Sequence, residues 1–561
     1  MASSSSLLSR FWQSRWVRWL TYLGAFFVAL IAALTVWMNR KGERDWKAAQ
    51  EALVREGVEL DFKAVKVVPI PDAENFCAIP LLNGISVVED GDASKGEPAA
   101  KRKALEALGL PPVHATISRP SISSSASIDV PLELREWADW FRKIGHPMPV
   151  TDPDNVAREV LGALSYQDAA MVEMAAALDR PVSRLVPDWR LGPLPDPLLL
   201  RQMPHLSALQ NLATGLGLRA KAAAQAGECS KAHEASLCLA RIAEASCQEP
   251  HVIGLLVGIT FTSILADATW ELGTAHCGTA EDFLRLQRAL EKFDIRRDAV
   301  RAFKEEVAAN VDSIFYVQRH RKFPDFPLGV GGSEWDTAEK LLWLIPEGWF
   351  ESNAAHVAML NLDHIVRPLR DHGWATALAE GDRLEARLKA AKAEIWWHPD
   401  MIVAVLSLPA FSRFVDRATY TQCQLDRAII ACALERFRLE HGTYPNALAE
   451  LARAGEKPLP LDILSGNPMG YRKTDDGRYV LWAVGFDRSD DGGYRPKGDG
   501  RTDKPTRRNY RGDWVWTYPT PEEIAEAKDP APPTGTKRVK TRTLKNKAEN
   551  PPQKSDTEPT Q

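Results

Sequence analysis

The spacing of hydrophobic and polar residues changes from one part of this chain to the next. The longest hydrophobic run without a charged residue lies near its start. This run is residues 19–38, twenty positions long. At about 1.5 Å per helical residue they reach about 30 Å, the thickness of the hydrocarbon layer of a bilayer. The run exceeds the core of a cleaved signal peptide and ends at Trp37 and Met38 rather than at small residues. The pattern therefore predicts an uncleaved transmembrane helix.

Aromatic and basic residues flank this run. Tryptophans favour the boundary between lipid and water, and four frame the run: Trp12, Trp16, Trp19 and Trp37. Three basic residues precede the run and three follow it, namely Arg10, Arg15, Arg18, Arg40, Lys41 and Arg44. The count does not decide the orientation, but residues 1–18 carry no acidic side chain, and long domains cross a membrane largely regardless of flanking charge. We expect residues 1–18 in the cytoplasm and the bulk of the chain outside it.

Residues 39–190 show mixed patterns, which predict a helical stalk at 40–60 followed by a loop-rich region. The polar segment Glu89–Lys103 and the serine-rich segment Ser118–Ser127 are expected to be exposed loops. One helix stands out, because Leu134, Trp137 and Phe141 share a helical face.

Residues 191–417 follow a helical period and predict a helical domain. One expected hairpin turns at Gly227, between helices at 219–226 and 232–245, and another joins 252–274 to 280–293. The apolar stretch 251–265 is too short for a span, so we expect a buried core helix. No repeat of fixed length occurs, which favours an irregular bundle or array over a solenoid.

Further along, near Pro346 and Gly348, one helix is expected to end and the next to start close to Asn353. The residues Trp396–Asp400 that follow the next helices are interpreted as a packed turn.

Residues 418–517 predict a small α+β lobe. An amphipathic helix at 419–440 carries an apolar stripe of Ile430, Ala433, Leu434 and Phe437. Short strands with Tyr471, Tyr479, Leu481 and Ala483 are expected around the turn at 475–477. Residues 518–561 are polar and proline-rich, which predicts a disordered basic tail that keeps the chain soluble. The alternative is that its basic residues between Lys537 and Lys547 contact anionic lipid or an envelope polymer. The fold class is therefore mainly α, with one transmembrane helix, a helical bundle or array, the small lobe and the tail.

Net charge and cysteine spacing bear on which ligands and covalent links the chain can have. A net charge of −4 with both signs interspersed argues against nucleic acid. The seven cysteines include no C-x-x-C pair, so a structural zinc site is not expected. Cys423 and Cys432 would lie on opposite faces of one helix and cannot bond to each other. Some of the others could pair across a hairpin, while most are expected to be small buried apolar residues.

The C-terminal segment resembles the C-terminal lobe of the major pseudopilin of type II secretion. The matching residues are Leu434–Phe437, His441–Pro445, Leu459–Asp462, Gly466–Pro468, Tyr471, Tyr479–Asp487 and Asp490–Gly493. The resemblance covers about 80 residues and implies an α+β lobe. It does not extend to the pseudopilin leader, and the predicted span lies far from the lobe, so assembly into a fibre is not expected.

The same resemblance implies a calcium loop. Asp487, Asp490 and Asp491, with Ser489, supply oxygen ligands within a few residues, and glycines follow. The alternative is an ordinary aspartate–glycine turn. No other cofactor is expected.

Two stretches, 69–82 (PIPDAENFCAIPLL) and 345–353 (IPEGWFESN), resemble those of uncharacterised membrane-anchored proteins of planctomycete and verrucomicrobial bacteria. The resemblance implies a bacterial inner (cytoplasmic) membrane and no particular activity. The sequence contains no GxSxG, HExxH or phosphate-loop pattern. We favour a non-enzymatic structural or interaction protein of the cell envelope, with the lipid bilayer and envelope proteins as partners. The alternative is an extracytoplasmic hydrolase that assembles a site from dispersed groups such as His364, His398 and Asp400.

Overall fold

The computed structural model describes residues 15–60, 69–87, 94–112, 117–122, 130–152, 154–185, 203–323, 339–408, 411–453, 455–494, 512–520 and 522–524. The chain divides into two compact units, Met1–Tyr518 and Pro519–Gln561. Most of the predicted tail lies outside the described residues, so its disorder stays a prediction. In the second unit, the Thr520 hydroxyl accepts a hydrogen bond from the Glu523 N–H, 3.1 Å, at the start of a short helical turn.

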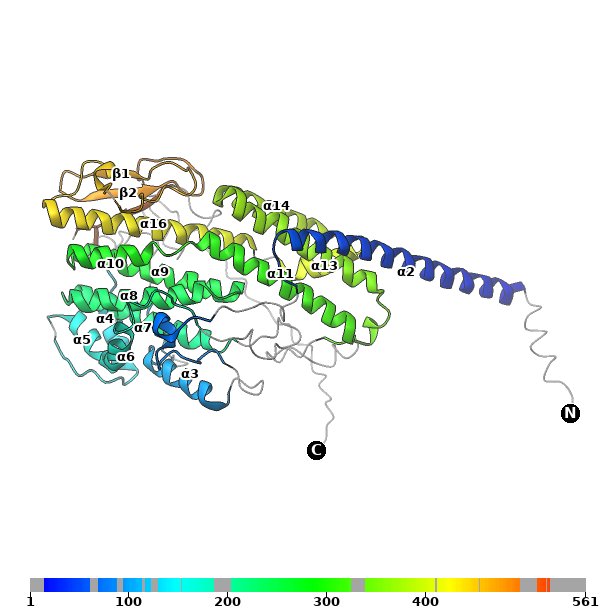
Figure 1. The fold of residues 1–561 in the computed structure, drawn as a ribbon, viewed down its shortest axis with the longest axis horizontal. Helices are drawn as coiled ribbons and strands as arrows, with labels where there is room; N and C mark the ends of the chain where they lie inside the picture. Colours follow the sequence, from blue (N-terminus) through cyan, green and yellow to red (C-terminus); the bar gives the residue numbers. More distant parts are fainter. Residues whose placement is uncertain are drawn as a thin grey trace, which may run out of the picture. The chain divides into compact units, whose positions relative to one another are not determined.

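The first unit begins with a single long helix, α2 (Arg15–Arg55), drawn in dark blue in Figure 1. Its apolar first part is wholly exposed within the unit and is long and apolar enough to cross a membrane. The second part is not a free stalk, because Ala49 and Leu53 are buried against the body. The helix thus continues from the predicted span directly into the folded core.

A set of short helices follows. They are η1 (Asp72–Glu74), η2 (Phe76–Ala78), α3 (Gly96–Leu108), α4 (Leu134–Lys143), α5 (Val156–Ala163), η3 (Ser165–Gln167) and α6 (Asp168–Ala175). The expected helical face of α4 is confirmed, since Leu134, Trp137 and Phe141 are buried. Asn75 ties η2 to the rest of the body, because its amide pairs with the backbone N–H and carbonyl of Arg184 at 3.0 and 2.9 Å.

The prediction of an exposed loop over 89–103 is wrong in its second half, where α3 forms. Pro98 lies in the first turn, where its missing N–H costs nothing, and the alanine, lysine and leucine residues that follow favour a helix. Leu105 is buried, and the Arg102 guanidinium donates hydrogen bonds to the carbonyls of Ile85 and Val87, both 2.8 Å. The glycines and charged residues of 89–103 therefore favoured a loop in the prediction, although the second half of this segment is an amphipathic helix.

The helical body is built from antiparallel neighbours. It contains α7 (His205–Gln225), α8 (Cys229–Cys247), α9 (Val252–Thr274), α10 (Ala280–Leu290), α11 (Ile295–His320), α13 (Glu347–Asn361), η5 (Leu362–Val366), η6 (Pro368–His372), α14 (Trp374–Ala393), η7 (Pro399–Met401), α15 (Ile402–Ser407) and α16 (Phe411–His441). The first expected hairpin is confirmed, and Gly227 turns it with a φ of +77°. The second is wrong in its packing, because α9 and α10 form as expected but α10 packs on α16 and α8 instead of on α9. The expected burial of the stretch 251–265 is confirmed too, because most of α9 is inside the body.

Helix α13 starts earlier than expected, at Glu347 instead of near Asn353. Pro346 occupies the N-cap position with extended backbone, and Glu347 places its negative charge in the first turn, where the helix dipole favours it. Gly348 therefore lies inside the helix and does not break it.

The C-terminal sheet has three antiparallel strands in the order β1 (Gly470–Lys473), β2 (Tyr479–Ala483) and β3 (Trp514–Thr517). The predicted hairpin is confirmed, with Tyr471 opposite Leu481. Strand β3 pairs with the other edge of β2, with Trp516 opposite Leu481. The sheet packs on α16 (Figure 1). In the expected apolar stripe of α16, Ile430, Ala433 and Leu434 are buried and Phe437 is half-buried.

The larger hydrophobic core runs from Ala49 of α2 to Tyr518. A second core lies around Trp137 and Phe141 of α4.

The cysteines divide into one disulfide and five buried thiols. Cys229 at the start of α8 bonds to Cys277, which lies just before α10. The free cysteines are Cys77, Cys238, Cys247, Cys423 and Cys432, all buried. This confirms that most cysteines act as small apolar residues and that Cys423 and Cys432 do not bond to each other.

Candidate functional site

The closest contact between α2 and the body is made by two glycines. A Cβ atom on Gly348 would lie 2.2 Å from the carbonyl oxygen of Met38, and a Cβ on Gly42 would lie 2.2 Å from the carbonyl oxygen of Gly348. No other residue type fits without moving a helix. The backbones of α2 and α13 therefore touch one turn beyond the predicted end of the span at Met38.

Polar contacts fix this junction. The Gly348 N–H donates to the Asn39 side-chain oxygen at 2.9 Å, and the Ser352 hydroxyl donates to the Asp45 carboxylate at 3.3 Å. The Lys41 ammonium lies 2.9 Å from Asp400. Burial is the largest single effect and raises the pKa of Asp400, but the hydrogen bond from Lys41 and the positive charge of Lys41 and His356 together outweigh it, and the pKa is lowered.

A second clamp holds the far end of α2. Glu56 accepts a hydrogen bond from the Arg367 guanidinium at 2.9 Å and another from Arg370. Although burial alone would raise the pKa of Glu56, these two arginines lower it. The Lys304 ammonium also donates to the Glu56 carbonyl oxygen, 2.5 Å. Because both ends of this helical segment are fixed, the apolar half of α2 leaves the body in a defined direction.

The groups considered for a hydrolase do not come together. Asp400 pairs with Lys41, His364 pairs with Glu380 at 2.9 Å, and His398 lies 3.8 Å from Glu394. Each belongs to a separate ion pair. The interpretation of 396–400 as a packed turn is wrong for its aromatic residues, since Trp396 and Trp397 are exposed.

One buried cluster of titratable groups was not anticipated. The Glu249 carboxylate lies 3.3 Å from the His205 imidazole and 3.1 Å from that of His251. Burial would raise the pKa of Glu249, but the two histidines lower it. His251 also caps α9 by accepting from the Gly254 N–H, 3.1 Å. In the sequence, only Glu249 and His251 stand close together, separated by Pro250. His205 reaches Glu249 only after folding, so the sequence does not predict this cluster.

Two carboxylates of the predicted calcium loop accept hydrogen bonds from nearby groups, and the third aspartate is held through its backbone. Asp487 accepts hydrogen bonds from the backbone N–H groups of Ser489 and Gly512, and Asp490 accepts from the Trp482 indole at 2.9 Å. The Asp491 N–H donates to Asp513. Across the described residues, no three acidic, histidine or cysteine side chains are placed to hold a metal ion. Calcium at Asp487, Asp490 and Asp491 stays a prediction.

Three of the residues that carry the pseudopilin resemblance have a clear structural role here. Gly442 ends α16 with a φ of +73°. The buried Tyr444 hydroxyl donates to the Glu435 carboxylate at 2.5 Å. Asp462 accepts from the Leu464 N–H at 2.9 Å and from the Val484 N–H at 2.7 Å, and it thereby joins the loop to β2.

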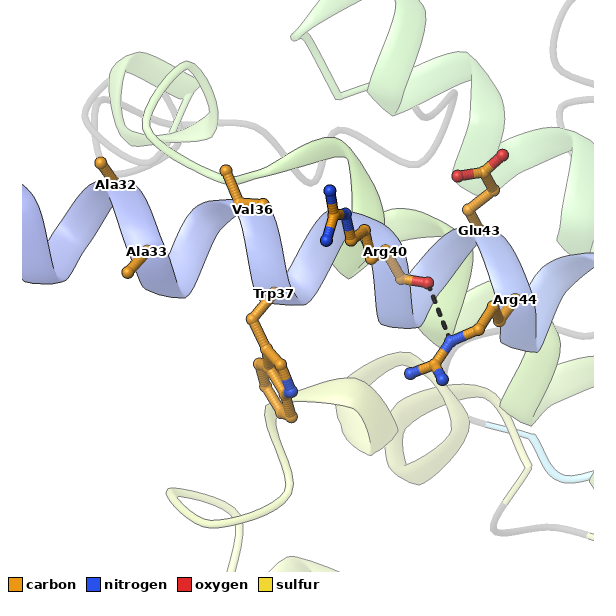
Figure 2. Close-up of a pocket in the computed structure, with 7 residues that line it drawn as sticks. All are labelled: Ala32, Ala33, Val36, Trp37, Arg40, Glu43 and Arg44. Carbon is orange, nitrogen blue, oxygen red and sulfur yellow. Dashed lines mark hydrogen bonds between the residues drawn. The ribbon is translucent and has the colours of Figure 1, made fainter.

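A hollow of about 710 Å³ lies along α2 (Figure 2). The described residues that line it are Ala32, Ala33, Val36, Trp37, Arg40, Glu43 and Arg44. Its lining is apolar up to Trp37 and charged from Arg40 on, so it crosses the predicted end of the span. Figure 2 shows Trp37 and Arg40 pointing to different sides of the helix.

In comparisons with known proteins, no family model, curated protein or solved structure matches this chain.

Proposed function

We propose that this chain is a single-pass protein of a bacterial inner membrane that holds a helical body outside the cytoplasm as a structural or interaction module of the cell envelope. The observation that carries the proposal is the contrast between its two long apolar helices. The window of α2 that could span a membrane is wholly exposed, whereas that of α9 is mostly buried. An exposed apolar helix of this length is stable only in lipid.

Two further features support the proposal. The junction at Gly42 and Gly348 continues the helix into the core, as an anchor requires. The disulfide between Cys229 and Cys277 favours an oxidising compartment, which lies outside the bacterial cytoplasm. The lobe around β1–β3, with its resemblance to the pseudopilin lobe, is proposed as the surface that meets envelope proteins.

Fractionation tests the anchor. The full chain is expected to stay with the membrane after alkaline carbonate washing, whereas a Phe27→Lys, Ile31→Lys variant is expected in the soluble fraction, because two charges in the span are costly. Both side chains are exposed, so the body should fold in either protein. Release of the unaltered chain by carbonate would overturn the proposal.

Labelling of an introduced cysteine tests the orientation. Glu51→Cys lies on the exposed side of α2 beyond the span, and all five free native cysteines are buried. A maleimide that does not cross membranes should label this cysteine in intact spheroplasts. Labelling only after lysis would place the body in the cytoplasm and contradict the proposed orientation.

A further inference from the structure

Exposed tryptophans gather in two kinds of place in the described part of the chain. Three lie on α2 around its apolar run, namely Trp16, Trp19 and Trp37. The other three lie far along the chain, where Trp343, Trp396 and Trp397 are 74%, 92% and 85% exposed. Leu344, beside Trp343, is 78% exposed. Burial of such side chains is strongly favourable, so water is a poor environment for them.

The three distant tryptophans lie in two turns, which we call the tryptophan turns, at 341–345 and 394–398. The backbone of the first turn is fixed to α11, because the guanidinium of Arg321, which follows this helix, donates to the carbonyls of Leu342 and Ile345 at 2.9 and 2.8 Å. The second is closed by the Trp397 N–H, which donates to the Glu394 carbonyl at 2.9 Å. Their backbones are fixed, while their aromatic side chains project outward.

Both turns are attached to the same short segment of α2. The first leads into Gly348, whose Cα lies against the backbone of Met38 and Asn39. The second leads into Asp400, which pairs with Lys41 at 2.9 Å. The segment 38–41 is the last residue of the predicted span and the first turn of helix beyond it. At about 1.5 Å per residue, it lies within about 5 Å of the end of the hydrocarbon layer, measured along the helix.

The hollow beside α2 marks the same boundary. Its lining changes from Ala33 and Val36 to Arg40 and Arg44 within about three helical turns (Figure 2). An apolar wall followed by two arginines, with Glu43 between them, leaves a net positive charge that fits an acyl chain and its phosphate headgroup. Trp37 stands at the change, as interfacial tryptophans do in membrane proteins.

We propose that the tryptophan turns dock on the surface of the bilayer that α2 crosses, with Trp343, Trp396 and Trp397 at the level of the headgroups. This inference rests on the proposed function, because it needs α2 to span the membrane. It adds a second, peripheral membrane contact made by residues about 300 or more positions from the span. Tryptophan suits this place, since its ring is apolar and its indole N–H can bond to a headgroup.

The test places a fluorescent bimane label at Trp397→Cys in the full chain, reconstituted in vesicles of phosphatidylethanolamine and phosphatidylglycerol. Lipid with a nitroxide near the headgroup should quench this label about twofold, since interfacial side chains lie within reach of that depth. Two labels serve as controls. Leu30→Cys, in the middle of the span, should be quenched by a nitroxide deep in the acyl chain. Glu51→Cys should be quenched by neither, because it lies about 20 Å beyond Met38 along the helix.

The outcomes separate the two proposals. Quenching at position 30 without quenching at 397 would leave the anchor in place and overturn the docking. No quenching at either position would overturn the anchor itself. A label at 397 that is shielded from aqueous iodide yet not quenched by the lipid nitroxides would mean that a protein surface, such as a second copy of the chain, covers the turn, and this too would overturn the docking.

Discussion

Charged residues on α16 are buried among its apolar ones, and Asp426 shows the consequence. Its carboxylate accepts a hydrogen bond from the Gln422 amide, 2.9 Å. Burial raises the pKa of Asp426 to about 7, and the nearby Asp294 carboxylate adds to the rise. The unfolded chain has a carboxyl pKa of about 3.9, so the folded state binds this proton more tightly. This contribution to stability is therefore full below about pH 4 and is lost as the pH rises to about 7.

Replacing Asp426 by Asn should remove this dependence. We expect the free energy of unfolding at pH 8 to increase by about 1–3 kcal/mol, because the buried negative charge is gone. At pH 4.5 the change should be much smaller. Urea unfolding in mild detergent at the two pH values measures it, with Asp475→Asn in the exposed β1–β2 turn as the control. An equal effect at both pH values would contradict the assignment.

Tyr444 is the residue of the pseudopilin-like segment with the clearest energetic role. Its hydroxyl donates to Glu435, which is almost fully buried and also accepts from Arg438 at 2.9 Å. Hydrogen bonds to charged groups contribute about 1.5–3 kcal/mol. Tyr444→Phe should therefore lower the free energy of unfolding by about that amount.

A matched tyrosine is available in the same lobe. Tyr471 donates to a neutral group, the backbone carbonyl of Pro445, at 2.7 Å, and it is only partly buried. Tyr471→Phe should therefore cost about 1 kcal/mol or less. Thermal melting of the two variants compares the two bonds. Equal losses would show that the charge of Glu435 does not strengthen its bond to Tyr444.

At the scale of elements, the sequence predicts those whose signals are local. The hairpin at Gly227 follows from one glycine between two alanine-rich helices, and the stripe ending at Phe437 follows from its spacing. Strand β3 is not predicted, although its residues Trp-Val-Trp-Thr favour a strand, because so short a segment does not reveal that it pairs with β2. The early start of α13 was hidden for a similar reason. Gly348 looks like a helix breaker unless its contact with α2 is known.

The two glycines of α2 provide a test of that contact. Gly42→Ala places a methyl group 2.2 Å from the Gly348 carbonyl oxygen, so the helices must separate. Gly24→Ala meets nothing within 4 Å. We expect the first change to destabilise the body by about 1–3 kcal/mol, as overpacking does, and the second to leave it unchanged. Thermal melting in detergent distinguishes them. If Gly24→Ala lowered the stability as much as Gly42→Ala, the effect would come from helix α2 in general and not from its contact with α13.

For the whole molecule, what the sequence cannot predict is how the anchor meets the body. Lys41 and Asp400 are 359 positions apart, and the sequence around either residue does not indicate that the two form an ion pair. The exposed turn at Trp396 and Trp397 was interpreted as packed because two adjacent aromatic residues usually are buried. The site therefore depends on long-range packing, whereas the span itself can be read from composition.

Two truncations separate the anchoring role of α2 from its role in the core. A chain that starts at Asn39 loses the apolar run but keeps Lys41, Gly42 and the buried Ala49 and Leu53. It should be soluble without detergent and keep the melting temperature of the full chain to within a few degrees. A chain that starts at Gly57 also loses the buried face of α2.

In that shorter chain, a groove opens along α13, and Arg367 and Arg370 lose their shared partner Glu56. Removing Leu53 alone is expected to cost about 2–5 kcal/mol, so this chain should melt at a clearly lower temperature or aggregate. Circular dichroism and size-exclusion chromatography of the two proteins measure the difference. If both chains melted at the same temperature, the second half of α2 would be a stalk after all, and the tryptophan turns would lose their fixed height above the membrane.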